Sequence, residues 1–263
     1  MVFFSTIEPV FYLLPIVGFT VGVFGTILGG GGGFFFLPVL TLGLKVPAQT
    51  AVITTLVATL PICIVGSLGH LRKGNVNARI GMLLSLFGVI GAFVGAWVTG
   101  VISTAQLKAG FGIYTILIAL NIVISTWREA GKTHLKKEKH KPLRMTKSGF
   151  LAFTAGIITG TFGTSGTAPI LASLFNMRIP VKVVIGTSLL VVLTNTLFAI
   201  SAHFLVSSID LTLVGFLTIG SVTGAVIGPK LLAKSTIEKS GDSVKYIYAF
   251  VMAIIGILMI TVK

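Results

Sequence analysis

The sequence predicts an all-α polytopic membrane protein built from two related halves. Three observations predict this class: the composition, a series of long charge-free stretches, and an internal repeat of glycine and proline positions. Of 263 residues, 54% are hydrophobic and only 10% are charged, and the mean hydropathy is +1.03. A soluble domain carries about a quarter charged residues. The composition therefore excludes an ordinary soluble enzyme.

The charge balance is strongly basic. Twenty Lys and Arg residues against six Asp and Glu give a formal charge of +14. Such a balance indicates nucleic acid, anionic lipid or an anionic substrate, but the basic residues lie between apolar stretches and form no face on a polar domain, so we expect no nucleic-acid partner. The single cysteine, Cys63, can form neither a disulfide nor a cysteine-based metal site within one chain.

The charge-free stretches reach or approach the roughly 20 residues that a helix needs to cross a bilayer. They cover residues 9–44, 46–69, 80–107, 109–127, 149–177, 183–209, 211–229 and 246–262. The beginning of the chain has neither a basic n-region nor an Ala-x-Ala cleavage pattern, so we expect no removable signal peptide. The sequence thus predicts a polytopic integral membrane protein, in contact with the lipid bilayer.

Two of the stretches, 9–44 and 149–180, are too long for one helix, and each is interrupted by glycines. The first contains five consecutive glycines at 29–33, and the second contains the Gly-rich segment 160–166. We expect each stretch to be a glycine-broken hairpin that is followed by about three transmembrane helices. The alternative is that each broken stretch crosses the membrane once.

The two broken stretches recur within an internal duplication. Gly25, Gly29, Gly32 and Pro38 return at an offset of 131, and Pro47, Thr54, Leu56, His70, Gly91 and Gly95 return at an offset of 133. The duplication predicts a first transmembrane repeat at 1–127, a basic linker at 128–147 and a second repeat at 148–263, which together form one integrated unit.

Basic loops stay in the cytoplasm, so the linker 128–147 and the loop 71–79 are predicted to be cytoplasmic and residues 204–210 to be outside. If each broken stretch is a hairpin, this assignment of cytoplasmic and outside loops makes the two halves inverted repeats. With single crossings, the halves would be parallel and the basic segment 230–245 would be outside. The inverted arrangement satisfies the charge rule in more places.

Inverted repeats with interrupted helices at corresponding positions are typical of secondary transporters, whose site lies at the repeat interface. The residues Gly25-x-x-x-Gly29 to Gly33 followed by Pro38, with the echo Gly160-x-x-Gly163-x-x-Gly166-x-x-Pro169, resemble the sulfite exporter TauE/SafE family of membrane permeases. The resemblance covers nearly the whole chain. It implies a permease or exporter for small sulfur-containing anions such as sulfite or sulfonates, located in a prokaryotic cell (inner) membrane.

The broken segments suit an anion by their own chemistry. Glycine lets a ligand approach the backbone, and a helix that restarts after a break presents unpaired N–H groups. Hydroxyl and amide donors in and after the breaks would complete such a site. The predicted substrate-binding residues are Gly30, Gly32, Gly33, Thr54, Thr164, Ser165, Gly166, Thr187, Ser188 and Asn195. The alternatives are glycines that only allow close helix packing and hydroxyls that bond to the carbonyl one turn back.

Three further residues are candidates for gating or proton coupling. His70 and His203 occupy equivalent positions at the ends of equivalent stretches, and an imidazole titrates near neutral pH. Phe34 follows the first glycine run and could close a cavity beside it. The alternatives are histidines that reach to water at the membrane surface and an aromatic side chain that serves packing.

The sequence shows no metal-spaced Cys or His cluster, no intramembrane carboxylate and no catalytic constellation, so we expect no enzyme, no catalytic residue, no metal and no cofactor. The partners predicted are a small sulfur-containing anion and the lipid bilayer. An anion channel or a membrane scaffold protein is the alternative function. Without a membrane carboxylate to relay protons, movement driven by the membrane potential alone is expected.

Overall fold

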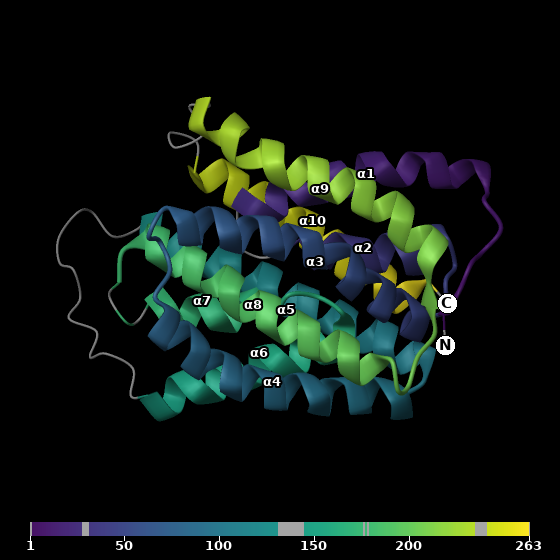
Figure 1. The fold of residues 1–263 in the computed structure, drawn as a ribbon, viewed down its shortest axis with the longest axis horizontal. Helices are drawn as coiled ribbons and strands as arrows, with labels where there is room; N and C mark the ends of the chain where they lie inside the picture. The colour runs from purple at the N-terminus through teal and green to yellow at the C-terminus, as the bar shows by residue number, and fades with distance from the viewer. Residues whose placement is uncertain are drawn as a thin grey trace.

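The computed structural model describes residues 2–27, 32–130, 145–175, 177, 179–234 and 241–262, and almost all of them are helical (Figure 1). The elements of the first half are β1 (Val2–Phe3), η1 (Pro9–Leu13), α1 (Leu14–Ile27), α2 (Gly33–Pro38), η2 (Val39–Gly43), α3 (Ala48–Arg72), α4 (Ala78–Val101) and α5 (Thr104–Ala130). Those of the second half are α6 (Met145–Phe162), α7 (Thr167–Phe175), α8 (Val181–His203), β2 (Ile209–Asp210), α9 (Leu211–Lys234) and α10 (Gly241–Thr261). Most of the linker, residues 131–144, lies outside the described residues.

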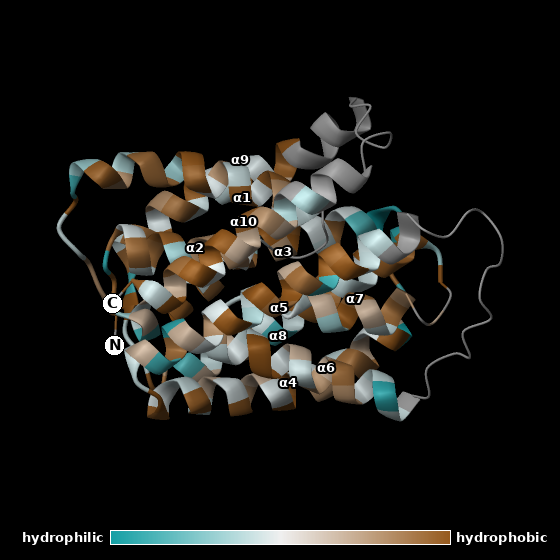
Figure 2. Ribbon diagram, turned by 180° about the vertical axis from the view of Figure 1, so that it is seen from behind, coloured by the Kyte–Doolittle hydropathy of each residue, from teal (hydrophilic) through white to brown (hydrophobic). Residues whose placement is uncertain are grey.

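The helices have the length and surface of membrane spans. Within the described residues, five helices are long and apolar enough to cross a membrane: Pro9–Thr26, Ala48–Arg72, Ala78–Val101, Thr104–Trp127 and Val181–His203. Large apolar side chains remain on the outside, including Trp97 and Trp127, which are 65% and 74% exposed. Hydrophobic residues predominate along the helices in Figure 2. Because water would not tolerate so much apolar surface, this all-α protein is an integral membrane protein.

The chain reverses direction at both glycine breaks. Gly32 has a φ of +75°, and a Cβ atom there would meet the side chain and carbonyl of Val21 in α1. Gly166 lies in the same way against the backbone of Ala155 in α6. In each half, therefore, the segment after the break folds back along the helix before it. Each broken stretch forms a hairpin rather than a single continuous crossing.

The two halves exchange helix partners. α1 of the first half packs along α9 of the second, and α6 of the second packs along α4 of the first. Glycines allow the backbones to approach closely at both interfaces. Gly156 of α6 lies against the carbonyl of Gly88 in α4, and Gly22 of α1 lies against the carbonyl of Ser221 in α9.

These contacts correct the register of the repeat. Gly88 and Ser221 are 133 residues apart, as the sequence predicts for α4 and α9. Gly22 and Gly156 are 134 apart, so α1 and α6 match at an offset of 134 rather than 131. The glycines and the proline of the breaks still recur at an offset of 131, so the helices before the breaks and the break residues do not share one offset.

Equivalent helices run antiparallel. The hydroxyl oxygens of Thr50, near the start of α3, and Ser208, beyond the end of α8, are 3.5 Å apart, whereas Gly186, near the start of α8, lies against Asn75, just after α3. Likewise, the Lys108 ammonium near the start of α5 donates to the carbonyl of Val262, 2.8 Å away, after α10. The bundle therefore has two ends: a terminal end with β1 and the end of α10, and a linker end with the end of α3 and the start of α8 (Figure 1).

Candidate functional site

The two glycine breaks touch each other inside the bundle. A Cβ atom on Gly33, which begins α2, would lie 3.0 Å from the carbonyl oxygen of Gly163 and 3.1 Å from the Cα atom of Thr164. Gly163 has a φ of +66° and lies against the carbonyl of Val52 in α3. Glycine is required at Gly163, which has left-handed backbone geometry and no space for a side chain, whereas a Cβ atom at Gly33 would be tightly packed and its neighbours would have to move by a few tenths of an ångström. The predicted site residue Gly30 lies outside the described residues.

Buried hydroxyls without partners occur in the second break and on the part of α3 that packs against it. Thr164 and Ser165 in the second break are 0% and 4% exposed, and Thr54 and Thr55, close to Val52 on α3, are both 0% exposed. None of these four hydroxyls has a hydrogen-bond partner among the described residues. Buried polar groups are normally satisfied, and leaving one unpaired costs about 1–3 kcal/mol. Two of these four groups belong to the second break and two to α3, and other unpaired buried hydroxyls, such as those of Ser85 and Ser148, lie elsewhere in the described bundle.

The backbone of the second break is also partly fixed by side chains. The N–H of Gly166 donates to Oγ1 of Thr159, 3.0 Å away. The Thr159 hydroxyl in turn donates to the carbonyl of Ala155 at 2.9 Å. These bonds hold the break in shape without using the hydroxyls of Thr164 and Ser165.

Thr187 and Ser188, which the sequence places in the same ring of donors, lie elsewhere. Oγ1 of Thr187 accepts a 2.9 Å hydrogen bond from the N–H of Asn77 and so supports the start of α4 at the linker end. The Ser188 hydroxyl donates to the carbonyl of Ile185 at 2.8 Å. Because α3 and α8 run antiparallel, Thr54 and Thr187 are displaced toward opposite ends of the bundle. Sequence equivalence therefore does not bring them together.

Asn195 lies deep in the bundle but not at the contact of the breaks. It is 0% exposed, and its amide lies where a side chain on Gly88 would be. Neither its amide nitrogen nor its carbonyl oxygen has a partner within the described residues. Gly88 lies against Gly156, about two helical turns before the second break. Asn195 is thus a further unsatisfied polar group in the interior.

An aromatic stack that the sequence analysis missed bridges the two breaks. Phe34 of α2 stacks on Tyr114 of α5 with ring centroids 5.9 Å apart, and Tyr114 stacks on Phe162, the last residue of α6, at 5.7 Å. The Tyr114 hydroxyl is buried and has no partner among the described residues. The available signal was the recurrence of Tyr114 as Tyr248 in the other half, at the offset of 134.

The two equivalent histidines differ in their surroundings. His203 is 0% exposed, and its Nε2 atom is 2.6 Å from the carbonyl oxygen of Gly160, just before the second break. His70 is half-buried at the linker end, and its Nδ1 atom has no partner within the described part of the chain.

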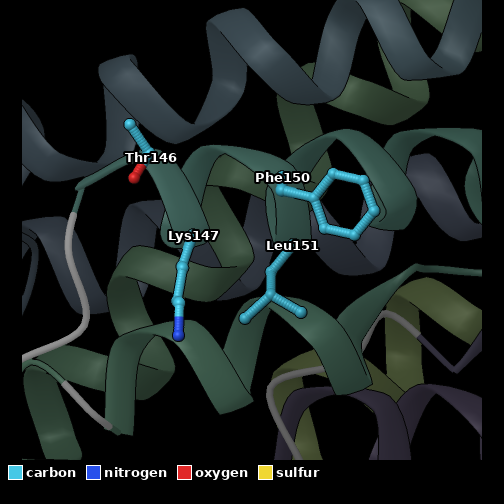
Figure 3. A pocket seen from close by; sticks show the side chains of 4 residues that line it. All are labelled: Thr146, Lys147, Phe150 and Leu151. Atoms are coloured by element: carbon cyan, nitrogen blue, oxygen red, sulfur yellow. The ribbon is translucent and has the colours of Figure 1, made fainter.

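An open hollow of about 450 Å³ lies away from this region. Thr146, Lys147, Phe150 and Leu151 line it, all on the first two turns of α6 (Figure 3). It contains none of the predicted site residues, and it touches neither break. We assign it no function.

Comparison with known proteins identifies the family. The family model described as sulfite exporter TauE/SafE matches residues 14–259, which include both breaks and all the helices that hold them. The chain belongs to the TauE/SafE family. Members of this family are membrane transporters and do not form an enzyme class, so this chain is a membrane transporter.

Curated relatives carry the same general description. The probable membrane transporter protein YdhB of Bacillus subtilis is 27% identical over 86% of this chain and 94% of its own length. YunE of the same organism, also named a probable membrane transporter protein, is 23% identical over 95% of this chain and 97% of its own length. A probable membrane transporter protein of Xylella fastidiosa is 29% identical over 85% of this chain. No solved structure matches the chain significantly.

Proposed function

We propose that this TauE/SafE transporter carries a small sulfur-containing oxyanion, such as sulfite or a sulfonate, through the place where the two glycine breaks meet. The observation that carries the proposal is the contact of Gly33 with Gly163 and Thr164, next to buried hydroxyls without partners. A partly dehydrated oxyanion needs several hydrogen-bond donors. Thr54, Thr55, Thr164 and Ser165 supply donors of that kind without a fixed charge that would hold the anion too tightly to release.

The sulfur-containing class comes from the family description, sulfite exporter, and the geometry supports its size and charge. Access for a ligand between touching glycine backbones favours a compact substrate over a bulky one. Among the described side chains, Asp210 is the only fully buried carboxylate, and it lies at the start of α9 rather than beside the breaks. No described carboxylate would therefore repel an anion at the contact.

The proposal includes inverted repeats with the linker end in the cytoplasm. Antiparallel equivalent helices and exchanged partners support the inversion. By their place in the helices, Arg72, Lys73, Arg79, Arg128, Lys147 and Lys182 lie at the linker end with the acids Glu129 and Asp242, so basic residues outnumber acids there, whereas the terminal end carries Lys45 and Lys108 with Glu8 and Asp210. A basic bias of this kind favours the cytoplasmic side.

Flux in proteoliposomes tests the function. We expect uptake of radiolabelled sulfite to saturate with concentration and to be inhibited by other sulfur oxyanions more strongly than by carboxylates of similar size. Empty liposomes give the background. Flux that rises linearly without competition would identify a channel, and the absence of flux for every anion tested would contradict transport and favour a scaffold.

A further inference from the structure

A basic cavity of about 480 Å³ opens at the linker end of the bundle. Its walls come from the ends of α1 and α3 and from α9, and it is lined by Thr26, Val65, Gly66, Leu68, Gly69, His70, Arg72, Lys73, Ala225 and Val226. Thr26 belongs to the last turn of α1, directly before the first break. The cavity therefore connects a basic surface with the segment that leads into the proposed anion site.

The internal duplication provides a matched copy of this region at the terminal end. At the offsets given by the helix contacts, His70 corresponds to His203, and Thr26 corresponds to Gly160. In the copy, the imidazole of His203 is fully buried and donates to the carbonyl of Gly160. The same pair of positions thus lines a cavity at one end and forms a closed hydrogen bond at the other.

Neighbouring pairs show the same difference. Val65 of α3 and Val226 of α9 line the cavity, and their counterparts Phe198 of α8 and Phe93 of α4 are in ring contact with centroids 6.2 Å apart. In addition, the Thr99 hydroxyl of α4 lies 3.3 Å from the carbonyl of Gly160 and 3.0 Å from that of Thr161, and so joins α4 to the end of α6. The terminal copy therefore carries ring and hydroxyl contacts between helices at positions that line the cavity in the linker copy, with Phe93 and Phe198 on the outer surface.

The charge of the two copies also differs. Arg72 and Lys73 at the linker end correspond to Leu205 and Val206 at the terminal end. Both basic side chains are exposed at the cavity rim. Within a narrow mouth, such charges raise the local concentration of an anion.

We propose that the cavity around His70, Arg72 and Lys73 is a docking site for the transported anion on the linker side, and that His203 with its Gly160 contact closes the equivalent route on the terminal side. The inference rests on the proposed function, since it names the entrance to that same anion pathway. The structure thus represents the state open to the linker end, and transport exchanges the open and closed copies.

Charge removal tests the docking site. In everted membrane vesicles, which expose the cytoplasmic side, Arg72→Gln with Lys73→Gln should raise the half-saturating concentration of radiolabelled sulfite about tenfold, the effect of two charges several ångströms from an anion in water. High salt should reduce this difference. Arg79→Gln is the matched control, because Arg79 is exposed at the same end and does not line the cavity. A double variant that behaves like the control while the wild type transports sulfite would overturn the docking site and leave the transport function intact.

Crosslinking tests the closed copy. Cys63 is fully buried, so Cys63→Ala gives a background without native thiols. On it, Phe93→Cys with Phe198→Cys should crosslink readily without substrate and stop sulfite flux until a reductant is added. Val65→Cys with Val226→Cys should crosslink more slowly, and faster once sulfite is present. Equal crosslinking of both pairs with and without sulfite, or undiminished flux in the crosslinked protein, would refute the exchange of open and closed copies.

Discussion

Three glycines on α9 allow the close approach of α1 and α9 to be tested within one helix. A Cβ atom on Gly220 would overlap the carbonyl oxygen of Pro15, and one on Gly224 would overlap that of Phe19. A Cβ atom on Gly215 would meet nothing within 4 Å. We therefore compare Gly220→Ala and Gly224→Ala with Gly215→Ala, which makes the same chemical change at an open position.

The expected loss of stability follows from the overlap between the added Cβ atom and the backbone of α1. Ordinary contact with the Cβ atom begins at 3.4 Å, so each alanine must push α1 away by roughly 1 Å or distort the helix, and overpacking of this kind costs about 1–3 kcal/mol. The packing lost matters because close van der Waals contact drives helix association in membranes. Gly215→Ala should be neutral or stabilising by up to about 1 kcal/mol, since alanine favours a helix over glycine.

Thermal unfolding of the detergent-purified proteins measures the difference. A loss of about 2 kcal/mol should lower Tm by roughly 4 to 8 °C for Gly220→Ala and Gly224→Ala, whereas Gly215→Ala should keep or raise it. If all three variants unfold at the same temperature as the wild type, the exchanged pairing of α1 with α9 is wrong.

Three further predictions concern individual roles. Thr164→Val should reduce sulfite flux strongly with little change in Tm, because its hydroxyl stabilises no described contact. Thr187→Val should retain flux and lose about 1 kcal/mol of stability, because it loses the hydrogen bond from the N–H of Asn77. The opposite pattern would place the site at the start of α8. Asp210 accepts from the N–H groups of Ser5, Thr212 and Leu213 at 3.3, 3.0 and 3.4 Å, so Asp210→Ala should cost about 1 kcal/mol in thermal unfolding and leave flux in place, while abolished flux in the still-folded Asp210→Asn protein would indicate a proton relay. A negative-inside potential contributes about 2.3 kcal/mol per charge per 100 mV to expelling an anion, so a potassium-valinomycin potential should change sulfite flux and a pH or Na⁺ gradient should not; accumulation driven by either ion gradient at zero potential, in a variant with both histidines replaced, would contradict uncoupled movement.

The sequence predicted the class, the spans and the breaks because these depend on local composition. Charge-free stretches and consecutive glycines are visible in one dimension, and the resemblance to the TauE/SafE family was confirmed. The sequence did not predict which helices pack together. Small residues at Gly220 and Gly224 indicate that another helix approaches closely, but they do not indicate which helix it is.

Of the predicted site residues, the structure places some in or near the second break and others away from it. Thr164 lies at the contact with Gly33, but Thr187 supports the start of α4. Antiparallel packing separates positions that the duplication equates. Tyr114 was missed because one tyrosine in an apolar stretch has no local signal, and its importance comes from stacking on two residues far away in the chain.

Transport through the contact of the two breaks is the central claim, and it is tested most directly by sulfite flux in proteoliposomes that contain Gly33→Val or Gly166→Val. Both positions are enclosed by backbone, so valine must separate the second break from its neighbours. Gly215→Val, which faces open space on α9, is the control for insertion and yield. We expect both break variants to insert into the membrane and to lose saturable flux while the control keeps it. Normal flux in both break variants would contradict the claim that the anion passes through the breaks.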